Sequence, residues 1–175
     1  RQQKWLDSAQ GRRQVAYWQH ALGEISSDLE LPKDMPTSSM PKMQPDMVYG
    51  RLSADLTRKL RELAASNRTT LYTVLLAGYA VLLHRHTGQD EITVGSPMPA
   101  RGLGKWDRTV GHFVNLVALR TCFDRSLTVR SLLRTLRETV QRGMAYQDYP
   151  FDELVKRLNP VRGQDRLPYF QTLFV

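Results

Sequence analysis

The chain has 175 residues, 41% of them hydrophobic and 24% charged, and these proportions are typical of a soluble globular protein. Lys and Arg outnumber Asp and Glu by 25 to 17, so the formal net charge of +8 favours an acidic partner without choosing among nucleic acid, membrane surface and protein. The single cysteine, Cys122, excludes an internal disulfide framework and a zinc site built from several cysteines, and it suits a reducing cytoplasm.

The first 46 residues contain a helical block and then a proline-rich stretch. Residues 2–22 are predicted to be helical, and four prolines within residues 29–46 predict a long surface crossover, because proline interrupts both helices and central strands. Such a crossover normally joins two folded units, so we expect residues 1–28 to continue a lobe that precedes residue 1. The candidate buried residues of the first block are Trp5, Ala9, Val15, Tyr17, Trp18 and Leu22.

Regular structure is expected to resume with a short strand over residues 47–52. The next segment predicts a helix, and Thr69 or Thr70 is placed to cap a second, buried helix over residues 71–86, which Gly88 would end. The apolar run inside that second helix is too short to span a bilayer, and the polar start of the chain is unlike a signal peptide. The first helix has one apolar face, made of Leu56, Leu60, Leu63 and Ala64.

The second half of the chain predicts two strands, two helices and a last strand. The strands are expected over residues 91–95 and 113–122, and Thr128 is placed to cap a helix with a single buried stripe. A short helix over residues 151–158 and a strand in the last seven residues complete the order. That stripe consists of Val129, Leu132, Leu133, Leu136 and Val140.

This order of elements predicts an α/β fold, a two-layer sandwich in which helices cover one face of a mixed β-sheet. Because a domain seldom stops inside its last core strand, we also expect the natural chain to extend beyond residue 175.

The histidines give no complete catalytic constellation. His84 and His86 lie two apart at a helix end and diverge, so a positively charged helix terminus explains them better than a metal site. His112 has no carboxylate nearby in the sequence, and strand alternation places it opposite Phe113 and Asn115. A structural or surface role is therefore favoured for His112.

The remaining polar groups also have plain structural explanations. Ser96 is expected at a strand end, where a nucleophile could sit, but no base accompanies it. The arginines of the helix after Thr128 could bind phosphates, yet no aromatic residues are interleaved with them, so a solvated basic face is favoured. Asp148 is interpreted as the cap of the helix over residues 151–158, with Asp152 and Glu153 complementing its dipole.

Several segments, taken together, resemble the condensation domains of nonribosomal peptide synthetases. The most specific matches are VGHFVNLVALR at residues 110–120 and YQDYPFDELV at residues 146–155, and the resemblance covers nearly the whole chain. One departure is Leu116, which stands where the family usually has threonine. The family's HHxxxDG signature is absent, because no two histidines of this chain are adjacent.

The resemblance implies a fold, an activity and partners. The fold would be one lobe of the chloramphenicol-acetyltransferase type, with residues 1–28 continuing from an N-terminal lobe, residues 29–46 crossing over and residues 47–175 forming the C-terminal lobe. The activity would be acyltransferase-type peptide bond formation between donor and acceptor thioesters. No cofactor would bind directly, since phosphopantetheine arms of carrier domains deliver the substrates. An adjacent adenylation domain is expected, while nucleic acid and membrane partners are not.

The resemblance also implies site residues and leaves one alternative open. No catalytic residue and no metal ligand are expected in this chain, so the chain alone is expected to be inactive. Ser96, Arg101, Asn115 and Gln147 are the candidates for shaping the substrate tunnel or the contact between lobes, and Asn115 is predicted to be hydrogen-bonded to neighbouring backbone. The alternative is a non-catalytic docking or scaffold module that holds an acidic carrier protein.

Overall fold

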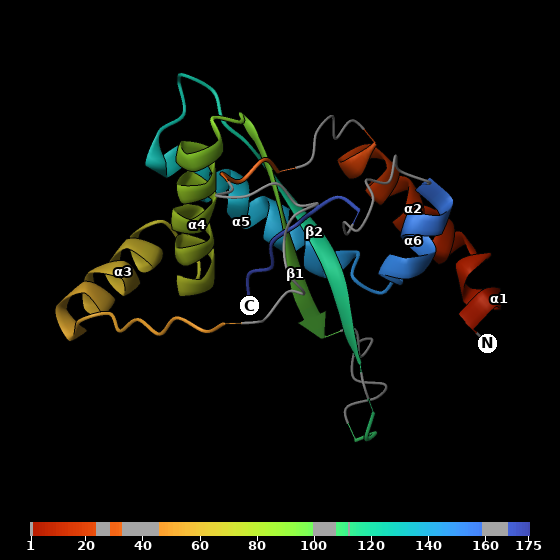
Figure 1. Cartoon of the computed structure of the whole chain (residues 1–175). Coiled ribbons are helices and arrows are strands. Elements are labelled where there is room, and N and C mark those ends of the chain that lie inside the picture. Colours follow the sequence, from red (N-terminus) through yellow and green to blue (C-terminus); the bar gives the residue numbers. More distant parts are fainter. Residues whose placement is uncertain (1, 24–28, 33–45, 100–107, 112, 159–167) are drawn as a thin grey trace.

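A computed structural model describes residues 2–23, 29–32, 46–99, 108–111, 113–158 and 168–175. Helices α1 and α2 lie on one side of a pair of strands, and α3, α4 and α5 lie on the other (Figure 1). The elements follow one another as α1 (Gln2–Leu6), α2 (Ala9–Leu22), α3 (Ala54–Ser66), α4 (Leu71–Thr87), β1 (Glu91–Pro99), β2 (Val114–Cys122), α5 (Val129–Ala145) and α6 (Phe151–Leu158).

The sheet contains two antiparallel strands and one short parallel addition. β1 pairs with β2 along its whole length, with Val94 opposite Leu119. The other edge of β1 receives the end of the chain, where Gly95 forms a parallel bridge with Leu173. The Gly95 N–H donates to the carbonyl of Thr172 at 2.9 Å. The predicted mixed sheet is therefore present among the described residues, although the last strand is reduced to a single bridge.

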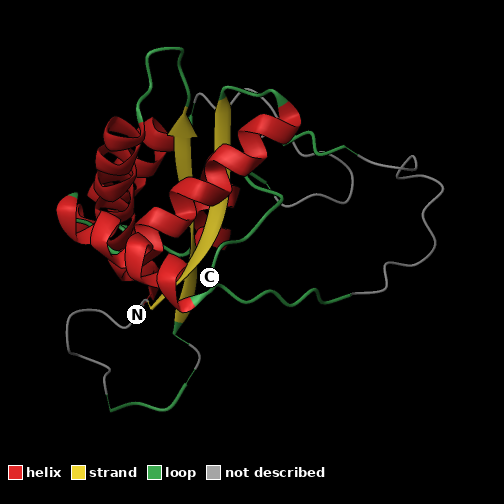
Figure 2. Cartoon of the chain, turned by 90° about the vertical axis from the view of Figure 1, so that its left-hand side faces the viewer, coloured by secondary structure: helices red, strands yellow, loops and turns green. Residues whose placement is uncertain are grey.

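Helices α4 and α5 cover one face of the strand pair. α4 packs against β1, and α5 packs against both α4 and β2. Figure 2, viewed from the side of α3 and α4, shows helices in front of both strands. At Gly143 of α5 the nearest side chain of β2, Leu119, lies within 3.1 Å of where a Cβ atom would be, so this helix approaches the strand closely. The expected coverage of one face of the sheet by helices is confirmed for α4 and α5, while α2 and α6 also contact β2.

Gly95 allows the opposite face of β1 to be covered by an aromatic ring. Phe170 is fully buried, and a Cβ atom at Gly95 would lie 2.6 Å from its Cδ2 atom. The same Cβ atom would lie 2.6 Å from Leu173. Any side chain at this position would therefore displace either the ring or the last segment of the chain.

Two expected elements differ from the structure at the start of the chain. The expected helix over residues 2–22 is interrupted, because Ser8 ends α1 and caps α2 by accepting from the Gly11 N–H at 3.2 Å. The strand expected over residues 47–52 is wrong: this segment has no strand, and Val48 is 97% exposed. Its β-favouring residues have no neighbouring strand to pair with among the described residues.

The helix termini predicted downstream are confirmed. Thr70 caps α4, and Gly88 ends it with the positive φ of 70° that favours glycine. Thr128 and Ser131 form a capping box at the start of α5. The buried stripe of α5 is confirmed except for Val129, which is 66% exposed because it precedes the part of the helix that faces the strands.

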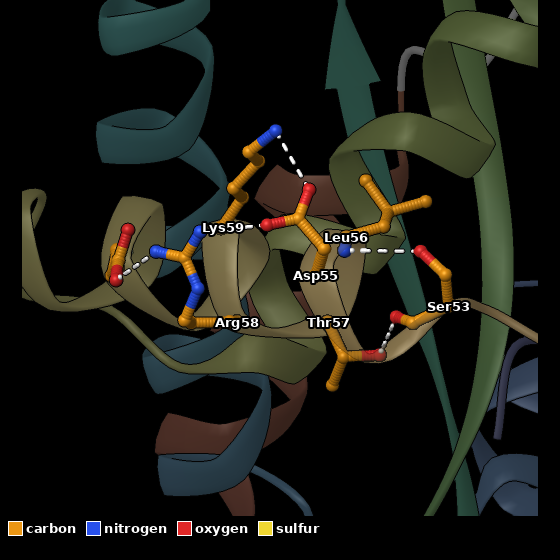
Figure 3. Close-up of polar contacts among 7 residues, drawn as sticks. Ser53, Asp55, Leu56, Thr57, Arg58 and Lys59 are labelled. Carbon is orange, nitrogen blue, oxygen red and sulfur yellow. Dashed lines mark hydrogen bonds and ion pairs between the residues drawn. The ribbon is translucent and has the colours of Figure 1, made fainter.

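Helix α3 begins with a cap and a set of surface ion pairs (Figure 3). Ser53 Oγ accepts from the Leu56 N–H at 3.2 Å. Asp55 pairs with Arg58 and Lys59 at 2.7 and 2.8 Å, and these bonds lower the pKa of its exposed carboxyl. All three side chains are mostly exposed, so this cluster stabilises the first turns of a helix and has no buried reactive group.

Two classes of feature are absent from the part of the chain that the structure describes. No helix there is long and apolar enough to cross a membrane. No group of three or more His, Cys, Asp or Glu residues there could hold a metal ion.

Candidate functional site: the turn between α5 and α6

Two of the polar candidates from the sequence, Asn115 and Gln147, meet at the turn between α5 and α6, residues 146–150, called here the α5–α6 turn. Tyr149 is buried in this turn, and Gln147 is half-buried. Side chains from β2 and α2 bind the backbone of the turn. The turn therefore joins parts of the chain that are far apart in sequence.

Asn115 of β2 makes three hydrogen bonds to this backbone. Its Nδ2 donates to the carbonyl oxygens of Gln147 and Tyr149, at 2.7 Å each. Its Oδ1 accepts from the Phe151 N–H at 3.0 Å. The prediction that Asn115 binds neighbouring backbone is confirmed. Both N–H bonds of the amide are used, so Asn115 cannot also donate to a substrate.

Asn115 also replaces the expected cap of α6. The first amide of a helix has no partner inside the helix, and the sequence assigned this role to Asp148. In the structure the Phe151 N–H is instead bound by Asn115 from across the turn. The expected cap at Asp148 is therefore wrong, because the Phe151 N–H is bound by Asn115, which lies 36 residues before it in the sequence.

Helix α2 holds the turn from the other side. The buried Gln14 accepts from the Tyr149 N–H at 2.9 Å, and the Trp18 Nε1–H donates to the carbonyl of Tyr146 at 2.9 Å. The rings of Tyr17 and Tyr146 are stacked with their centroids 4.0 Å apart. Burial raises the pKa of Tyr17, which keeps its hydroxyl neutral in this contact.

One polar atom of the turn is left without a partner. The Oε1 atom of Gln147 is buried and accepts no hydrogen bond in the part of the chain that the structure describes. The backbone carbonyl of the same residue is held by Asn115. Gln147 is therefore a fixed residue whose side-chain acceptor is unused.

Ser96 is buried in the core and is not a nucleophile at a strand end. It is the sixth of the nine residues of β1 and is 2% exposed. Its hydroxyl donates to the carbonyl of Phe174 at 2.9 Å, so the bond of 2.7 Å to Tyr72 must be donated by the Tyr72 hydroxyl. Burial raises the pKa of Tyr72, which favours this neutral donor. Ser96 fixes the end of the chain against α4 and β1.

The other candidates contribute little to this site. Arg101 and His112 lie outside the described residues. His84 is half-buried: its Nδ1 bonds the carbonyl of Gln89 at 2.8 Å, and its ring stacks on Phe123 with centroids 4.4 Å apart. His84 is thus part of the packing at the end of α4, whereas the sequence had favoured a positively charged helix terminus as its role.

Gln14 and Trp18 are functional candidates that the sequence did not identify. Trp18 was expected to be buried, but nothing indicated its hydrogen bond to a residue 128 positions away. Gln14 had no signal in the sequence except its place beside Val15, four positions before Trp18. That spacing puts Gln14 on the buried face of α2, where an amide needs a partner.

Comparison with known sequences agrees with this architecture. The family described as Condensation domain matches residues 1–175. The chain is 38% identical to tyrocidine synthase 3 from Brevibacillus parabrevis over 174 residues, and 35% identical to gramicidin S synthase 2 from Brevibacillus brevis over 173 residues. Both matches cover 99% of this chain, but only 3% of the tyrocidine synthase and 4% of the gramicidin S synthase, so the chain spans a small part of these proteins.

Solved structures of the same type superpose on the chain. The condensation domain of the monacolin K polyketide synthase MokA is 26% identical, with a TM-score of 0.81 over 99% of this chain and 43% of that one. The X-domain from teicoplanin biosynthesis has a TM-score of 0.85 at 23% identity, covering 98% of this chain and 38% of that one. The second likeness supports the fold alone. From the match to the family over all 175 residues, the chain belongs to the condensation domain family.

Proposed function

We propose that the chain is part of a domain that forms a peptide bond between an acyl or peptidyl donor and an aminoacyl acceptor, both held as thioesters on carrier domains. The observation that carries this proposal is the family match over the full 175 residues. Relatives at 38 and 35% identity are synthases of tyrocidine and gramicidin S. Phosphopantetheine arms of the carrier domains would present the two thioesters, and the chain itself would bind no cofactor.

The same proposal assigns parts of the chain. Residues 1–28 would continue an N-terminal lobe, residues 29–46 would cross over, and residues 47–175 would form the C-terminal lobe. The α5–α6 turn, held by α2 on one side and β2 on the other, would then be a contact between the lobes. Carrier domains and an adenylation domain would be the partners, in the cytoplasm. Gln147 would face the tunnel, while Ser96 and Asn115 would shape its walls through backbone contacts.

Single-turnover condensation tests the proposal. The natural synthetase protein that contains this domain is supplied with a donor-loaded and an acceptor-loaded carrier domain, and the amide product is detected by mass spectrometry. We expect product with the whole protein and none with residues 1–175 alone, because the family's histidine signature is not in this sequence. Failure of the whole protein to form the amide would refute the proposed function. Product formed by the isolated chain would refute the assignment of catalysis to another segment.

A second candidate is a non-catalytic module that holds an acidic carrier protein. The exposed side chains of Arg130 and Arg134 lie one turn apart on α5 and make no ion pair among the described residues. Two neighbouring positive charges of this kind favour binding to an acidic protein surface. Carrier binding that weakens with salt and with Arg134→Glu, in a protein that forms no amide, would favour this candidate over catalysis.

A further inference from the structure

Residues 47–52, called here the exposed arm, present apolar side chains that no other described segment covers. The arm contains no helix or strand, and it extends away from the strands as a loop (Figure 2). Val48 is 97% exposed, Tyr49 is 83% exposed and Met47 is 73% exposed, and Leu52 is exposed as well. Single apolar side chains on a surface need no explanation, but several neighbouring ones form a patch that marks an interaction site.

The arm is fixed at the end that leads into α3. Ser53 has an extended backbone, and its Oγ accepts from the Leu56 N–H at 3.2 Å. The Thr57 hydroxyl donates to the carbonyl of Ser53 at 2.9 Å. Since α3 packs against α4, the arm leaves the fold from a defined place. A partner that binds the arm therefore has few residues to order, which lowers the entropic cost of binding.

The apolar side chains are distributed along the arm as in a strand that is covered on both faces. Successive side chains of an extended chain point to opposite faces, so Val48 and Leu52 share one face and Met47 and Tyr49 share the other. A strand that lies on a protein surface needs one apolar face, whereas a strand covered on both sides is apolar on both. Valine and tyrosine favour strands, and the arm has an ordinary strand length.

The length of a related condensation domain indicates where the covering segment comes from. The chain covers 43% of the solved condensation domain of MokA, so more than half of that polypeptide lies outside the matched part. A second copy of the chain is a weaker candidate, because the net charge of +8 on each copy opposes their association. The remaining part of the same domain has no such penalty and is tethered to the arm.

We propose that the exposed arm is the docking site for an extended strand from the remaining part of the same condensation domain. The strand pairs with the backbone of the arm, and the packing around it covers the apolar side chains. Backbone pairing supplies affinity, while the alternating side chains of the arm set the register of the two strands. This inference uses the family membership and the surface of the arm, and it does not depend on the proposed peptide-bond-forming activity.

Amide hydrogen exchange on the natural protein that contains the whole domain tests the docking site. Pairing removes the amides of the arm from water, so we expect their exchange to be at least about a hundredfold slower than in an unstructured peptide of the same sequence. In Val48→Asp this protection should fall at least about tenfold, because a carboxylate resists burial. The matched control is Val129→Asp, which places the same charge at another exposed valine and should leave the protection of the arm unchanged.

The amides of β1 separate a local effect from damage to the fold. They should stay protected in both variants, because the arm does not pair with β1. Where Val48→Asp also removes the protection of β1, Val48→Thr provides a milder loss of apolar surface at the same position. An arm whose amides exchange as fast as the unstructured peptide in the natural protein would overturn the inference without any variant.

A photo-crosslinker at Tyr49 identifies the partner. Tyr49→benzoylphenylalanine exchanges one exposed aromatic side chain for another, and mass spectrometry of the cross-linked peptides locates the residue that it reaches. We expect a cross-link within the same polypeptide to a segment of the condensation domain outside residues 1–175. Cross-links only to a carrier or adenylation domain, to a second copy or to residues within 1–175 would each overturn the inference.

The outcomes of these tests and of the condensation assay are distinct. Amide formation by a protein with an unprotected arm would leave the proposed function intact and remove the docking site. A protein with a protected and correctly cross-linked arm that forms no amide would retain the docking site and remove the proposed function.

Discussion

Replacing Asn115 by leucine should destabilise the chain more than any other exchange of one polar side chain in β2. The side chain of Asn115 makes three hydrogen bonds of 2.7, 2.7 and 3.0 Å to the α5–α6 turn and the start of α6. At about 1 kcal/mol of net stabilisation for each bond, the loss is about 3 kcal/mol. A change of that size lowers the unfolding temperature of a chain of this length by about 6–12 °C. Leucine has a similar volume, so packing changes should add little.

Urea unfolding followed by tryptophan fluorescence measures this change, since Trp18 contacts the same turn. The control is Gln141→Leu, an exposed amide on α5 whose loss should change the free energy of unfolding by less than about 0.5 kcal/mol. Amide hydrogen exchange gives a second readout, because the Phe151 N–H should lose its protection in Asn115→Leu. An unfolding midpoint of Asn115→Leu equal to that of the parent would refute the structural role of Asn115.

Three further predictions concern stability. Gly95→Ala should lower the free energy of unfolding by about 1–3 kcal/mol, because the new Cβ would lie 2.6 Å from Phe170 Cδ2. The control is Gly78→Ala on the open face of α4, which should raise the free energy of unfolding by up to about 1 kcal/mol. Equal effects of the two substitutions in denaturant unfolding would contradict the close packing at Gly95. Thr128→Ala should cost about 1 kcal/mol by removing the cap of α5, and unchanged α-helical ellipticity and midpoint would contradict it. Burial raises the pKa of Tyr72 above its ordinary value of 10.0, so the Tyr72 hydroxyl stays protonated to a higher pH in the folded state than in the unfolded state. The free energy of unfolding should therefore fall as the pH rises past 10, and it should fall less in Tyr72→Phe. Identical pH profiles of the two proteins would refute this prediction.

Local signals in the sequence predicted the elements whose ends are set by local chemistry. Thr70, Gly88 and Thr128 act through bonds to residues three or four positions away, and each end was predicted correctly. The helix over residues 151–158 was also predicted with its observed bounds, because its apolar spacing and its charges agree with one another. Such signals need no knowledge of the rest of the fold.

Errors arose where a distant part of the chain decides the structure. Residues 47–52 favour a strand by composition, yet a strand forms only beside another strand, and none is present there among the described residues. Asn115 was recognised as a polar residue needing a backbone partner, but the sequence could not indicate that this partner is the start of α6. For the same reason the sequence could not indicate the role of Gln14, because its hydrogen-bond partner Tyr149 is 135 positions away.

Helix α2 has a consequence for the order of folding during synthesis. Its bonds to the α5–α6 turn join residues 128 and 135 positions apart, so they cannot form until the chain has been made from α2 up to that turn. At roughly 5–20 residues per second, that delay is on the order of 10 seconds after α2 itself is synthesised. During this interval the apolar side of α2, with Val15, Trp18 and Leu22, is without its final partners. A newly made chain should therefore need protection at α2 first, and chaperone binding to stalled nascent chains should disappear once the α5–α6 turn can fold.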